Sequence, residues 1–505
     1  MKKITPQAIS DIEAYIDQTL QTWGIPGGAS LILKDGQLLS NRGYGVRELG
    51  KPEKMDADTI FHIASSTKAF TAACLGLLVD EGKLSWDDPV VKYLPEFKVY
   101  DPWITQEVSV RDLLNHKLGL KRYNHIMFRN IPFDPDEFLQ HVPFMKPFTP
   151  FRTRFVYGNE QYVIAGKLIE VISGKPYDVF LQERIFDPLG MTSTFPSLAH
   201  LERSGRTNIC HGHCNLDGGF VPVGVRLQDP VQSLPLVDIG LNAAGGIWST
   251  LSDLARWLEF FLGNGTFQGK TLASPQVMAE LQTPQFAIAP EDEELNTIFS
   301  AVGVEINIMT YAFGWYVMDY QGRKLVVHGG NIHNGNNIIG FLPGENVAFL
   351  IFVNTYQVIA HALMSFYLLD ALFEKPVDYS ARGLEAAGMW QAGATQAIEG
   401  LVSSKKLDTH PSQPLERYAG KYASPLMGEL QLALKDGKLH FTYGNSHMFD
   451  AALQHWQDDT FVVDFVNKYQ DPEFVAFQVD EDGSVSSLVW LDPEFNEIDA
   501  MGHLQ

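Results

Sequence analysis

The chain has 505 residues, of which 45% are hydrophobic and 19% are charged. This length exceeds what one compact core supports, so we expect two or three domains, and the composition excludes a globally disordered chain. The formal net charge of -22 argues against nucleic-acid binding, because so negative a surface repels phosphate backbones.

The N-terminal stretch MKKITPQAISDIEAYIDQTLQTWG places isoleucines and aromatic residues at helical spacing among acidic and amide side chains. This pattern predicts an amphipathic helix rather than a secretory signal. Apolar runs stay below the roughly 18 residues that a membrane span needs. We therefore expect a soluble, cytoplasmic protein without a membrane partner, although a leader removed beforehand would leave the same sequence.

A β-hairpin is predicted next, because apolar runs flank Asp35-Gly36, a favoured tight-turn pair. A helix over Ser66 to Glu81 should end at Gly82. The region of about 86–300 is mostly helical in pattern, and antiparallel strands follow from about residue 311. Because strands and helices occur in separate runs, the sequence predicts an α+β domain over residues 1–376.

The chain after residue 376 changes character twice. Residues 377–412 are rich in Ala, Gly and Ser, which indicates a linker with some helix. Residues 413–505 alternate apolar and polar positions between turn signals, including Asp436-Gly437 and Asp482-Gly483. That pattern predicts a small all-β domain, either a sandwich or a barrel.

The three cysteines fall in two places. Cys74 lies in the apolar helix and is interpreted as a core residue, whereas Cys210 and Cys214 bracket the sequence CHGHC. The spacing of this cluster is poor for zinc, which usually takes a pair of ligands from each of two separated segments. A plain loop, a disulfide and a bound metal stay open as readings, and we expect no metal and no cofactor.

The stretch FHIASSTKAF places Ser65 three residues before Lys68 at the start of an apolar helical pattern. Residues at this spacing share a helix face, about 5–6 Å apart. A serine hydroxyl over a helix N-terminus is favourably placed to develop negative charge, and a partly buried lysine is tunable to a pKa of about 7–8. The pattern alone also fits a helix-capping serine with an exposed lysine.

Two further segments carry polar residues beside apolar elements. Tyr157 and Asn159 lie two apart in a loop before an apolar helix, and His328-Gly329-Gly330 ends an apolar strand. The loop could present a phenol and an amide to one cavity, and the glycines allow close approach of a substrate backbone. The alternatives are a buried tyrosine with a capping asparagine, and a simple turn.

Together, S-x-x-K, Y-x-N and H-x-G in this order resemble the serine-reactive penicillin-recognising superfamily. It includes class C β-lactamases, D-alanyl-D-alanine carboxypeptidases, D-aminopeptidases and β-lactamase-type esterases. The resemblance spans roughly residues 8–374 and includes LLNHKLGL at Leu113, FDPLGM at Phe186, AAGGIWSTLSDLARW at Ala243 and GKLSWDDPV at Gly82. The C-terminal stretch, with LERYAGKYASP and KDGKLHF, resembles the small lipocalin-like β domain behind some members.

The resemblance implies a fold and roles for the site residues. The fold is β-lactamase/transpeptidase-like, an antiparallel sheet flanked by helices plus a mostly helical subdomain, with the active site between these two parts. Ser65 would be the nucleophile that forms an acyl-enzyme, and Lys68 and Tyr157 would share the proton transfers. Asn159 would hold the substrate amide or the Lys68 ammonium. The backbone N–H groups of Ser65 and Asn331, just past Gly330, would form the oxyanion hole.

Some positions depart from the family pattern. His328 stands where many relatives have lysine, which removes a permanent positive charge and disfavours a carboxylate-bearing substrate such as a penicillin. His328 could instead carry a proton itself. The segment after Gly330, NIHNGNN, is longer than usual, brings His333 and three more asparagines near the cleft, and puts the Asn331 role in doubt. The loop before Tyr157 reads PFRTRFVYGN where relatives usually have Pro-Gly, and its Arg152 is either exposed or directed to the cleft.

The function we expect is that of a serine hydrolase acting on a small amide, short peptide or ester through an acyl-enzyme, as a D-aminopeptidase, carboxypeptidase or esterase does. An acyltransferase or peptide cyclase would use the same intermediate with another acceptor. A catalytically silent ligand-binding protein is an alternative of a different class. The C-terminal domain would cover the site, mediate self-association into a homo-oligomer, or stabilise passively.

Overall fold

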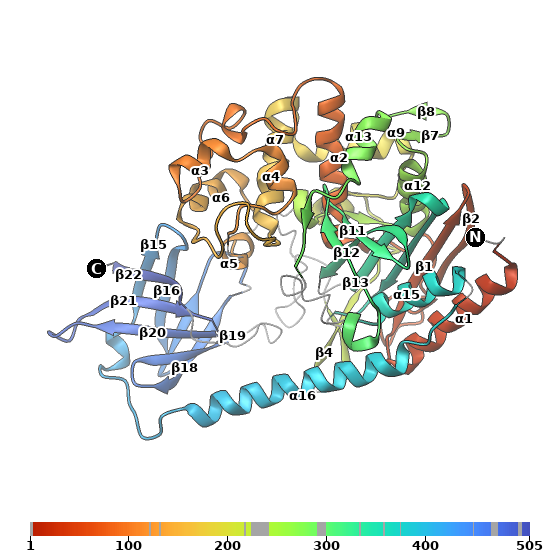
Figure 1. Ribbon diagram of the computed structural model, residues 1–505. Coiled ribbons are helices and arrows are strands. Elements are labelled where there is room, and N and C mark those ends of the chain that lie inside the picture. Colours follow the sequence, from red (N-terminus) through yellow and green to blue (C-terminus); the bar gives the residue numbers. More distant parts are fainter. Residues whose placement is uncertain are drawn as a thin grey trace.

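The computed structural model describes residues 4–120, 123–130, 133–216, 219–223, 242–289, 299–332, 335–356, 359–373, 375–447, 449–465, 473–492 and 497–504. Within these ranges the chain forms a sheet covered by helices, a mostly helical part, and a C-terminal barrel (Figure 1). The α+β expectation and the all-β C-terminal domain are both confirmed.

The main sheet has eight antiparallel strands and joins segments from both ends of the first 375 residues. In spatial order the strands are β2 (Gln37–Gly45), β1 (Gly27–Lys34), β14 (Val347–Val353), β13 (Gly335–Leu342), β12 (Arg323–Ile332), β11 (Tyr316–Tyr320), β10 (Met309–Tyr311) and β9 (Phe286–Ala287). The hairpin around Asp35-Gly36 is present as predicted.

Strand β14 shows why this sheet needs helices on both faces. All seven residues of its sequence VAFLIFV are buried. Leu350 and Phe352 pack with the core that contains α12 (Leu251–Leu262), whereas Phe349 and Ile351 face α1 (Pro6–Thr22) and α15 (Ala360–Leu372). Alternate residues of a strand point to opposite faces, so a continuous apolar run marks a strand that is covered twice.

The helical part is built around α2 (Thr67–Asp80), in which every residue from Thr67 to Leu78 is buried. The prediction of Ser66 to Glu81 differs from the observed bounds by one residue at each end. Around it lie α3 (Pro102–Glu107), α4 (Val110–Leu114), α5 (Asn124–Phe128), α6 (Pro135–His141), α7 (Asn159–Ser173), α8 (Tyr177–Leu181), α10 (Leu198–Arg203), α11 (Asn242–Gly245) and α13 (Pro275–Leu281).

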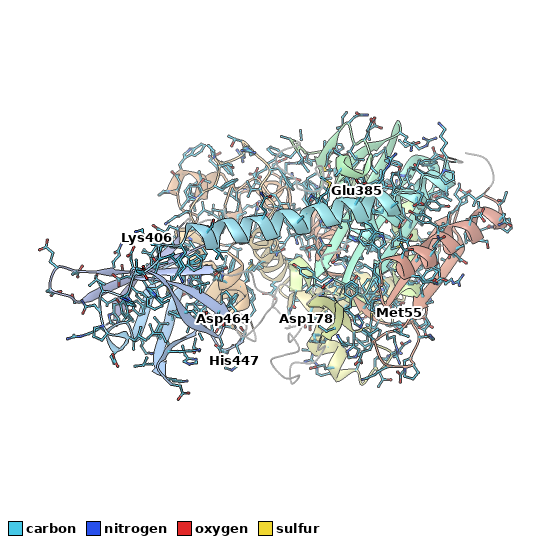
Figure 2. The ribbon with its side chains drawn as sticks, turned by 90° about the horizontal axis from the view of Figure 1, so that it is seen from below. Met55, Asp178, Glu385, Lys406, His447 and Asp464 are labelled. Carbon is cyan, nitrogen blue, oxygen red and sulfur yellow. The ribbon has the colours of Figure 1, made fainter. Side chains whose placement is uncertain are left out.

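The stretch expected as a linker contains one long helix, α16 (Ser380–Ser404), which runs from the catalytic part to the barrel (Figures 1 and 2). Its alanines favour helix strongly enough to offset the interspersed glycines. At its start, Trp23 Nε1 donates to Ser380 Oγ at 3.2 Å. None of the helices in the described ranges, α16 included, is both long and apolar enough to cross a membrane.

The C-terminal domain is a closed antiparallel barrel, which decides between the two predicted all-β architectures. Large side chains such as Tyr422, Phe441 and Trp490 are buried in its core. Its strands are β15 (Gly420–Ser424), β16 (Gly428–Lys435), β17 (Lys438–Thr442), β18 (Ala451–Gln457), β19 (Thr460–Phe465), β20 (Glu473–Val479), β21 (Val485–Leu491) and β22 (Glu497–Leu504).

Candidate active site

Ser65 lies in the 3-10 turn Ala64–Ser66, directly before α2. The preceding residue, Ala64, has a φ of +46°, a left-handed conformation that costs energy for a residue with a side chain. Residues held in such conformations cluster at functional sites. The turn leaves Ser65 half-buried at the N-terminus of α2, where the sequence placed it.

Lys68 is fully buried, with 0% of its surface exposed, and its Nζ contacts three oxygen atoms. The distances are 3.2 Å to Ser65 Oγ, 2.7 Å to Asn159 Oδ1 and 2.8 Å to the carbonyl oxygen of Ala244. A protonated Lys68 would donate to all three. A neutral Lys68 that donates to the two carbonyl oxygens keeps its lone pair for the Ser65 hydroxyl. Proton transfer between Ser65 and Lys68 therefore needs no rearrangement of the site.

Tyr157 borders this lysine. Its ring centroid lies 4.9 Å from Lys68 Nζ, and its ring packs 4.5 Å from the ring of His116. His116 Nδ1 also accepts a hydrogen bond of 3.2 Å from the backbone N–H of Gly158. This buried histidine therefore supports the loop that carries Tyr157 into α7, whose first residue is Asn159.

His328 is neutral in this environment. Its side chain is buried, and burial together with the nearby charge of Lys68 lowers its pKa to about 3. Its Nδ1 lies 2.7 Å from the carbonyl oxygen of Gly329 and must donate there. The other nitrogen, Nε2, therefore accepts from the hydroxyl of Tyr311 at 2.9 Å. Burial raises the pKa of Tyr311, so this phenol keeps its proton.

The two glycines of the H-x-G segment have different surroundings. A Cβ on Gly330 would lie 2.1 Å from the carbonyl oxygen of Ile63, just before the turn that holds Ser65. A Cβ on Gly329 would meet only the carbonyl oxygen of Asn337, at 3.5 Å. Gly330 thus permits the close approach of β12 to the Ser65 segment, and Asn331 follows it as an exposed residue.

Asn337 joins the same strands to the turn that holds Ser65. Its Oδ1 accepts from Ser66 Oγ at 2.8 Å, and its Nδ2 lies 3.1 Å from Ile63 O and 3.3 Å from Gly330 O. The side chain is fully buried. One amide therefore braces both flanks of Ser65 against β12 and β13.

Comparison with known proteins agrees with this geometry. The model of the β-lactamase family matches residues 12–370. The chain belongs to the β-lactamase family. A second match, over residues 404–503, is to a domain of unknown function named DUF3471. The chain is 26% identical over 441 residues to the unguisins hydrolase ungD' of Aspergillus campestris (strain IBT 28561), covering 84% of this chain and 77% of that relative.

Two solved structures share the fold of this β-lactamase family member. The octameric penicillin-binding protein homologue from Pyrococcus abyssi superposes with a TM-score of 0.61 at 20% identity, over 98% of this chain and 99% of that one. The D-amino acid amidase from Ochrobactrum anthropi SV3 gives 0.57 at 23% identity, over 73% of this chain and 99% of that one. The chain is thus built on the β-lactamase fold, and the family resemblance inferred from its motifs is confirmed.

The sequence analysis assigned no role to three residues of this site. Asn337 lay in a run of asparagines to which no role could be given, and its partner Ser66 is 271 positions away. His116 stood inside the family segment LLNHKLGL but was read only as part of that match. Tyr311 begins YAFGW, where nothing distinguishes it from a core aromatic. His333 and Asn334 lie outside the described residues.

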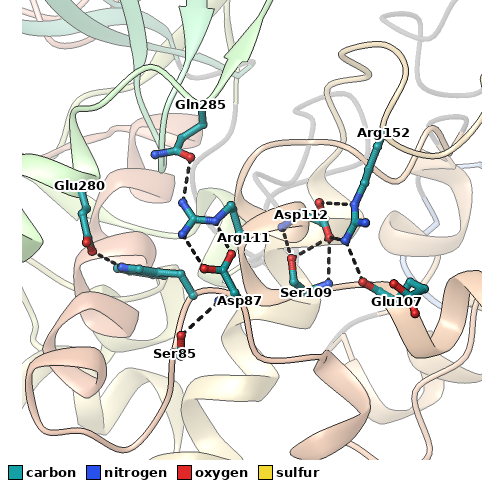
Figure 3. Close-up of polar contacts among 10 residues, drawn as sticks. Ser85, Asp87, Glu107, Ser109, Arg111, Asp112, Arg152, Glu280 and Gln285 are labelled. Atoms are coloured by element: carbon teal, nitrogen blue, oxygen red, sulfur yellow. Dashed lines mark hydrogen bonds and ion pairs between the residues drawn. The ribbon is translucent and has the colours of Figure 1, made fainter.

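Arg152 does not contact Ser65, Lys68 or Tyr157 among the described contacts. Its Nε and Nη2 donate to the two carboxylate oxygens of Asp112 at 3.0 and 2.7 Å, and Nη2 also donates to the Glu107 carbonyl at 2.9 Å (Figure 3). Asp112 in turn caps α4 through Ser109. We interpret Arg152, an exposed residue, as a brace on α4.

The CHGHC segment leads from a loop at Cys210 and His211 into a strand, and it holds no disulfide. Residues Gly212–Leu216 form β4, which pairs with β5 (Gly219–Val223), and Cys210 and Cys214 are buried thiols that are not joined in a disulfide. Burial raises the pKa of both thiols, that of Cys214 to about 12. Both ring nitrogens of His213 are hydrogen-bonded: Nε2 accepts from the Leu49 N–H, and Nδ1 contacts the Asn354 carbonyl oxygen. Across the described ranges, no group of three or more His, Cys, Asp or Glu is placed to hold a metal ion.

Proposed function

We propose that this chain hydrolyses a small amide, short peptide or ester through an acyl-enzyme on Ser65. The observation that carries the proposal is the set of three contacts of buried Lys68, to Ser65, Asn159 and Ala244. A buried lysine costs free energy, and here its amine is aimed at a hydroxyl at the start of a helix. This arrangement supports the roles of nucleophile for Ser65 and of base for Lys68.

In the first step Ser65 Oγ attacks the carbonyl carbon of the substrate and its proton passes to Lys68 Nζ. The backbone N–H groups of Ser65 and Asn331 would stabilise the oxyanion of the tetrahedral intermediate. Such a donor typically contributes about 2.7–4 kcal/mol at the transition state. Gly330 supports this role because only glycine there lets β12 lie against the residues before Ser65.

In the second step the bond to the leaving group breaks, and that group takes a proton through Tyr157 or directly from Lys68. Water then attacks the acyl carbonyl, gives a proton to Lys68 or Tyr157, and releases the acid and free Ser65. The centroid of the Tyr157 ring lies 4.9 Å from Lys68 Nζ, which supports a shared part for the two residues in the proton transfers. Asn159 orients Lys68 throughout.

The neutrality of His328 favours substrates without a carboxylate beside the scissile bond. At neutral pH this residue supplies no positive charge, because its pKa is lowered to about 3. An uncharged imidazole, hydrogen-bonded on both nitrogens, is better suited to a positioning role than to proton transfer. This proposal fits the names of the relatives, a D-amino acid amidase and an unguisins hydrolase, without assigning either substrate.

The substrate class is tested with two p-nitrophenyl esters of matched size, the butyrate and the hydrogen succinate, which differ in one carboxylate. We expect the neutral butyrate to give the higher kcat/KM, because His328 is uncharged and supplies no positive charge to a substrate carboxylate. A preference for the succinate would contradict this substrate assignment. Adding an amine and measuring its acylation against hydrolysis distinguishes a hydrolase from an acyltransferase or peptide cyclase.

Self-association is a second proposal, supported by the Pyrococcus abyssi homologue, which is described as octameric and covers 98% of this chain. Multi-angle light scattering on the full chain tests it directly. A mass near 56.4 kDa at micromolar concentration would contradict it.

A further inference from the structure

The C-terminal barrel contacts the short helix α5, which lies between the barrel and the rest of the helical part (Figure 1). Arg129, one residue past α5, is the centre of this contact and is only 7% exposed. Its Nη1 donates to the carbonyl oxygen of Met427 in the barrel. Its own carbonyl oxygen accepts from the backbone N–H of Ser446 at 2.9 Å. Both the side chain and the backbone of Arg129 are thus bound to the barrel.

The rest of α5 is held by the same domain. His125 Nε2 lies 3.0 Å from Oε1 of Glu473, a barrel residue that also accepts from Trp490 Nε1 at 2.6 Å. The buried side chains Ile126 and Met127 share one apolar core with the barrel interior. The contact therefore combines hydrogen bonds with buried apolar side chains, as stable interfaces do.

The other end of α5 leads to the catalytic residues. Tyr123, the residue before α5, donates its backbone N–H to Glu160 Oε1 at 2.9 Å. Glu160 is 2% exposed and follows Asn159 in the first turn of α7. Asn159 Oδ1 accepts the 2.7 Å hydrogen bond from Lys68 Nζ. A continuous set of contacts thus connects the barrel with Lys68, the base in the proposed reaction.

We propose that the barrel is a positioning domain for the catalytic site. By holding α5 through Arg129 and His125, it fixes Tyr123 against Glu160 and so sets the first turn of α7, which carries Asn159. This inference rests on the proposed function only for its effect on the reaction, because the mechanical connection exists whether or not Ser65 is acylated. Tyr123 and Glu160 are positioning residues here, since neither touches the reacting atoms.

Three barrel glycines offer a matched test. Gly428, Gly437 and Gly444 all have a φ of +74°, so alanine imposes a similar backbone strain at each. A Cβ on Gly428 would lie 2.2 Å from Arg129 Nη1, and one on Gly444 would lie 2.1 Å from the Arg129 carbonyl oxygen. A Cβ on Gly437 would meet nothing within 4 Å. Only the first two substitutions displace Arg129.

The readout is hydrogen–deuterium exchange on the full chain of Gly428→Ala, Gly444→Ala and the control Gly437→Ala. We expect the amide of Tyr123 and the amides of the first turn of α7 to exchange at least about tenfold faster in the first two variants than in the control. The acylation rate of Ser65 should fall in the same two variants, with a smaller change in KM. The backbone strain that alanine imposes at all three positions should lower the thermal unfolding temperature of the three variants by a similar amount.

Unchanged exchange at α7 in both Arg129-facing variants would overturn the proposal, as would equal acceleration in all three. If the wild type acylates no donor, the proposed function fails, but the exchange pattern still decides whether the barrel orders α7. Glu160→Gln, which retains an acceptor for Tyr123, should restore most of the protection and rate lost in Glu160→Leu. Equal loss in both Glu160 variants would contradict the Tyr123 connection.

Discussion

Lys68 Nζ lies 3.2 Å from Ser65 Oγ and is held there by two carbonyl oxygens, those of Asn159 and Ala244. The two elements that supply these oxygens, α7 and α11, both pack against α2, which carries the lysine. The position of Lys68, the proposed base, is therefore fixed by the fold before substrate arrives. A preorganised base and nucleophile avoid rearrangement during the reaction.

Replacing this lysine should abolish acylation while preserving the fold. Lys68→Met retains the length and the buried apolar stem but removes the amine, so we expect the acylation rate to fall by about 10²–10⁴-fold. Stopped-flow measurement with an activated ester gives the rate, and circular dichroism checks the fold. Lys83→Met, at a half-exposed lysine past the end of α2, is the control. Equal rates in Lys68→Met and wild type would remove Lys68 from the mechanism.

The glycine pair in β12 should respond unequally to alanine. Gly330→Ala must push β12 away from Ile63, because the nearest obstacle is a backbone oxygen at 2.1 Å, whereas Gly329→Ala makes only ordinary contact at 3.5 Å. We expect Gly330→Ala to lower the thermal unfolding temperature by several degrees, since a clash of this kind costs about 1–3 kcal/mol. It should also slow acylation. Gly329→Ala should unfold near the wild-type temperature, and a loss as large as that of Gly330→Ala would contradict the packing argument.

The brace between Ser66 and Asn337 should appear as an energetic coupling. Ser66 Oγ donates to Asn337 Oδ1 at 2.8 Å in a fully buried setting. A double-mutant cycle of Ser66→Ala and Asn337→Ala, measured by urea unfolding, should give a coupling of about 0.5–3 kcal/mol. Asn337→Ala alone should cost more than Ser66→Ala, because it also leaves the Ile63 and Gly330 carbonyls without their donor. Strict additivity would mean that the brace contributes nothing.

The sequence predicted those parts of the site that depend on local spacing. Ser65, in the turn that leads into α2, and Lys68, in the first turn of α2, are three residues apart, so their contact was predicted from local spacing. Tyr157 and Asn159 followed from their place ahead of an apolar helix. Asn337 could not be recognised, because its partners at Ile63 and Ser66 come from a segment more than 270 positions away. Long-range pairing of that kind depends on the register of β12 and β13.

For the all-β domain, too, local patterns were predictable from the sequence and long-range strand pairing was not. Alternating strands and the turns at Asp436 and Asp482 predicted its class, but closure into a barrel depends on the pairing of β15 with β22 at opposite ends of the domain. Residues 377–412 looked like a linker because of their small side chains, yet alanine also favours helix, and α16 is the result. Composition alone did not distinguish a linker from a long helix.

The stability of the folded protein should fall on acidification, in part because of His328. Its pKa is lowered from 6.5 to about 3 by burial and by Lys68, so the unfolded chain binds a proton that the folded chain does not. The neutral histidine therefore contributes its full stabilisation above pH 6.5. That contribution is lost as the pH falls from 6.5 towards 3, at up to about 1.4 kcal/mol per pH unit.

His328→Gln, which keeps an acceptor for Tyr311, should flatten this dependence. Urea unfolding at pH 7 and pH 4.5 should show a smaller difference in the variant than in the wild type. Part of the dependence should persist, because burial also lowers the pKa of His62 to about 4. An identical pH dependence in wild type and His328→Gln would show that His328 is not held neutral in the folded state.

The central claim is that Ser65 becomes acylated, and intact-protein mass spectrometry tests it most directly. The full chain is mixed briefly with an activated aryl ester, a D-aminoacyl amide and a β-lactam, with Ser65→Ala in parallel. We predict a mass increase equal to one acyl group in the wild type and none in the variant, largest with the ester or the amide. An adduct that persists in Ser65→Ala, or turnover of any donor by that variant at the wild-type rate, would contradict the account. No adduct and no product from any donor would favour a ligand-binding protein on the same fold.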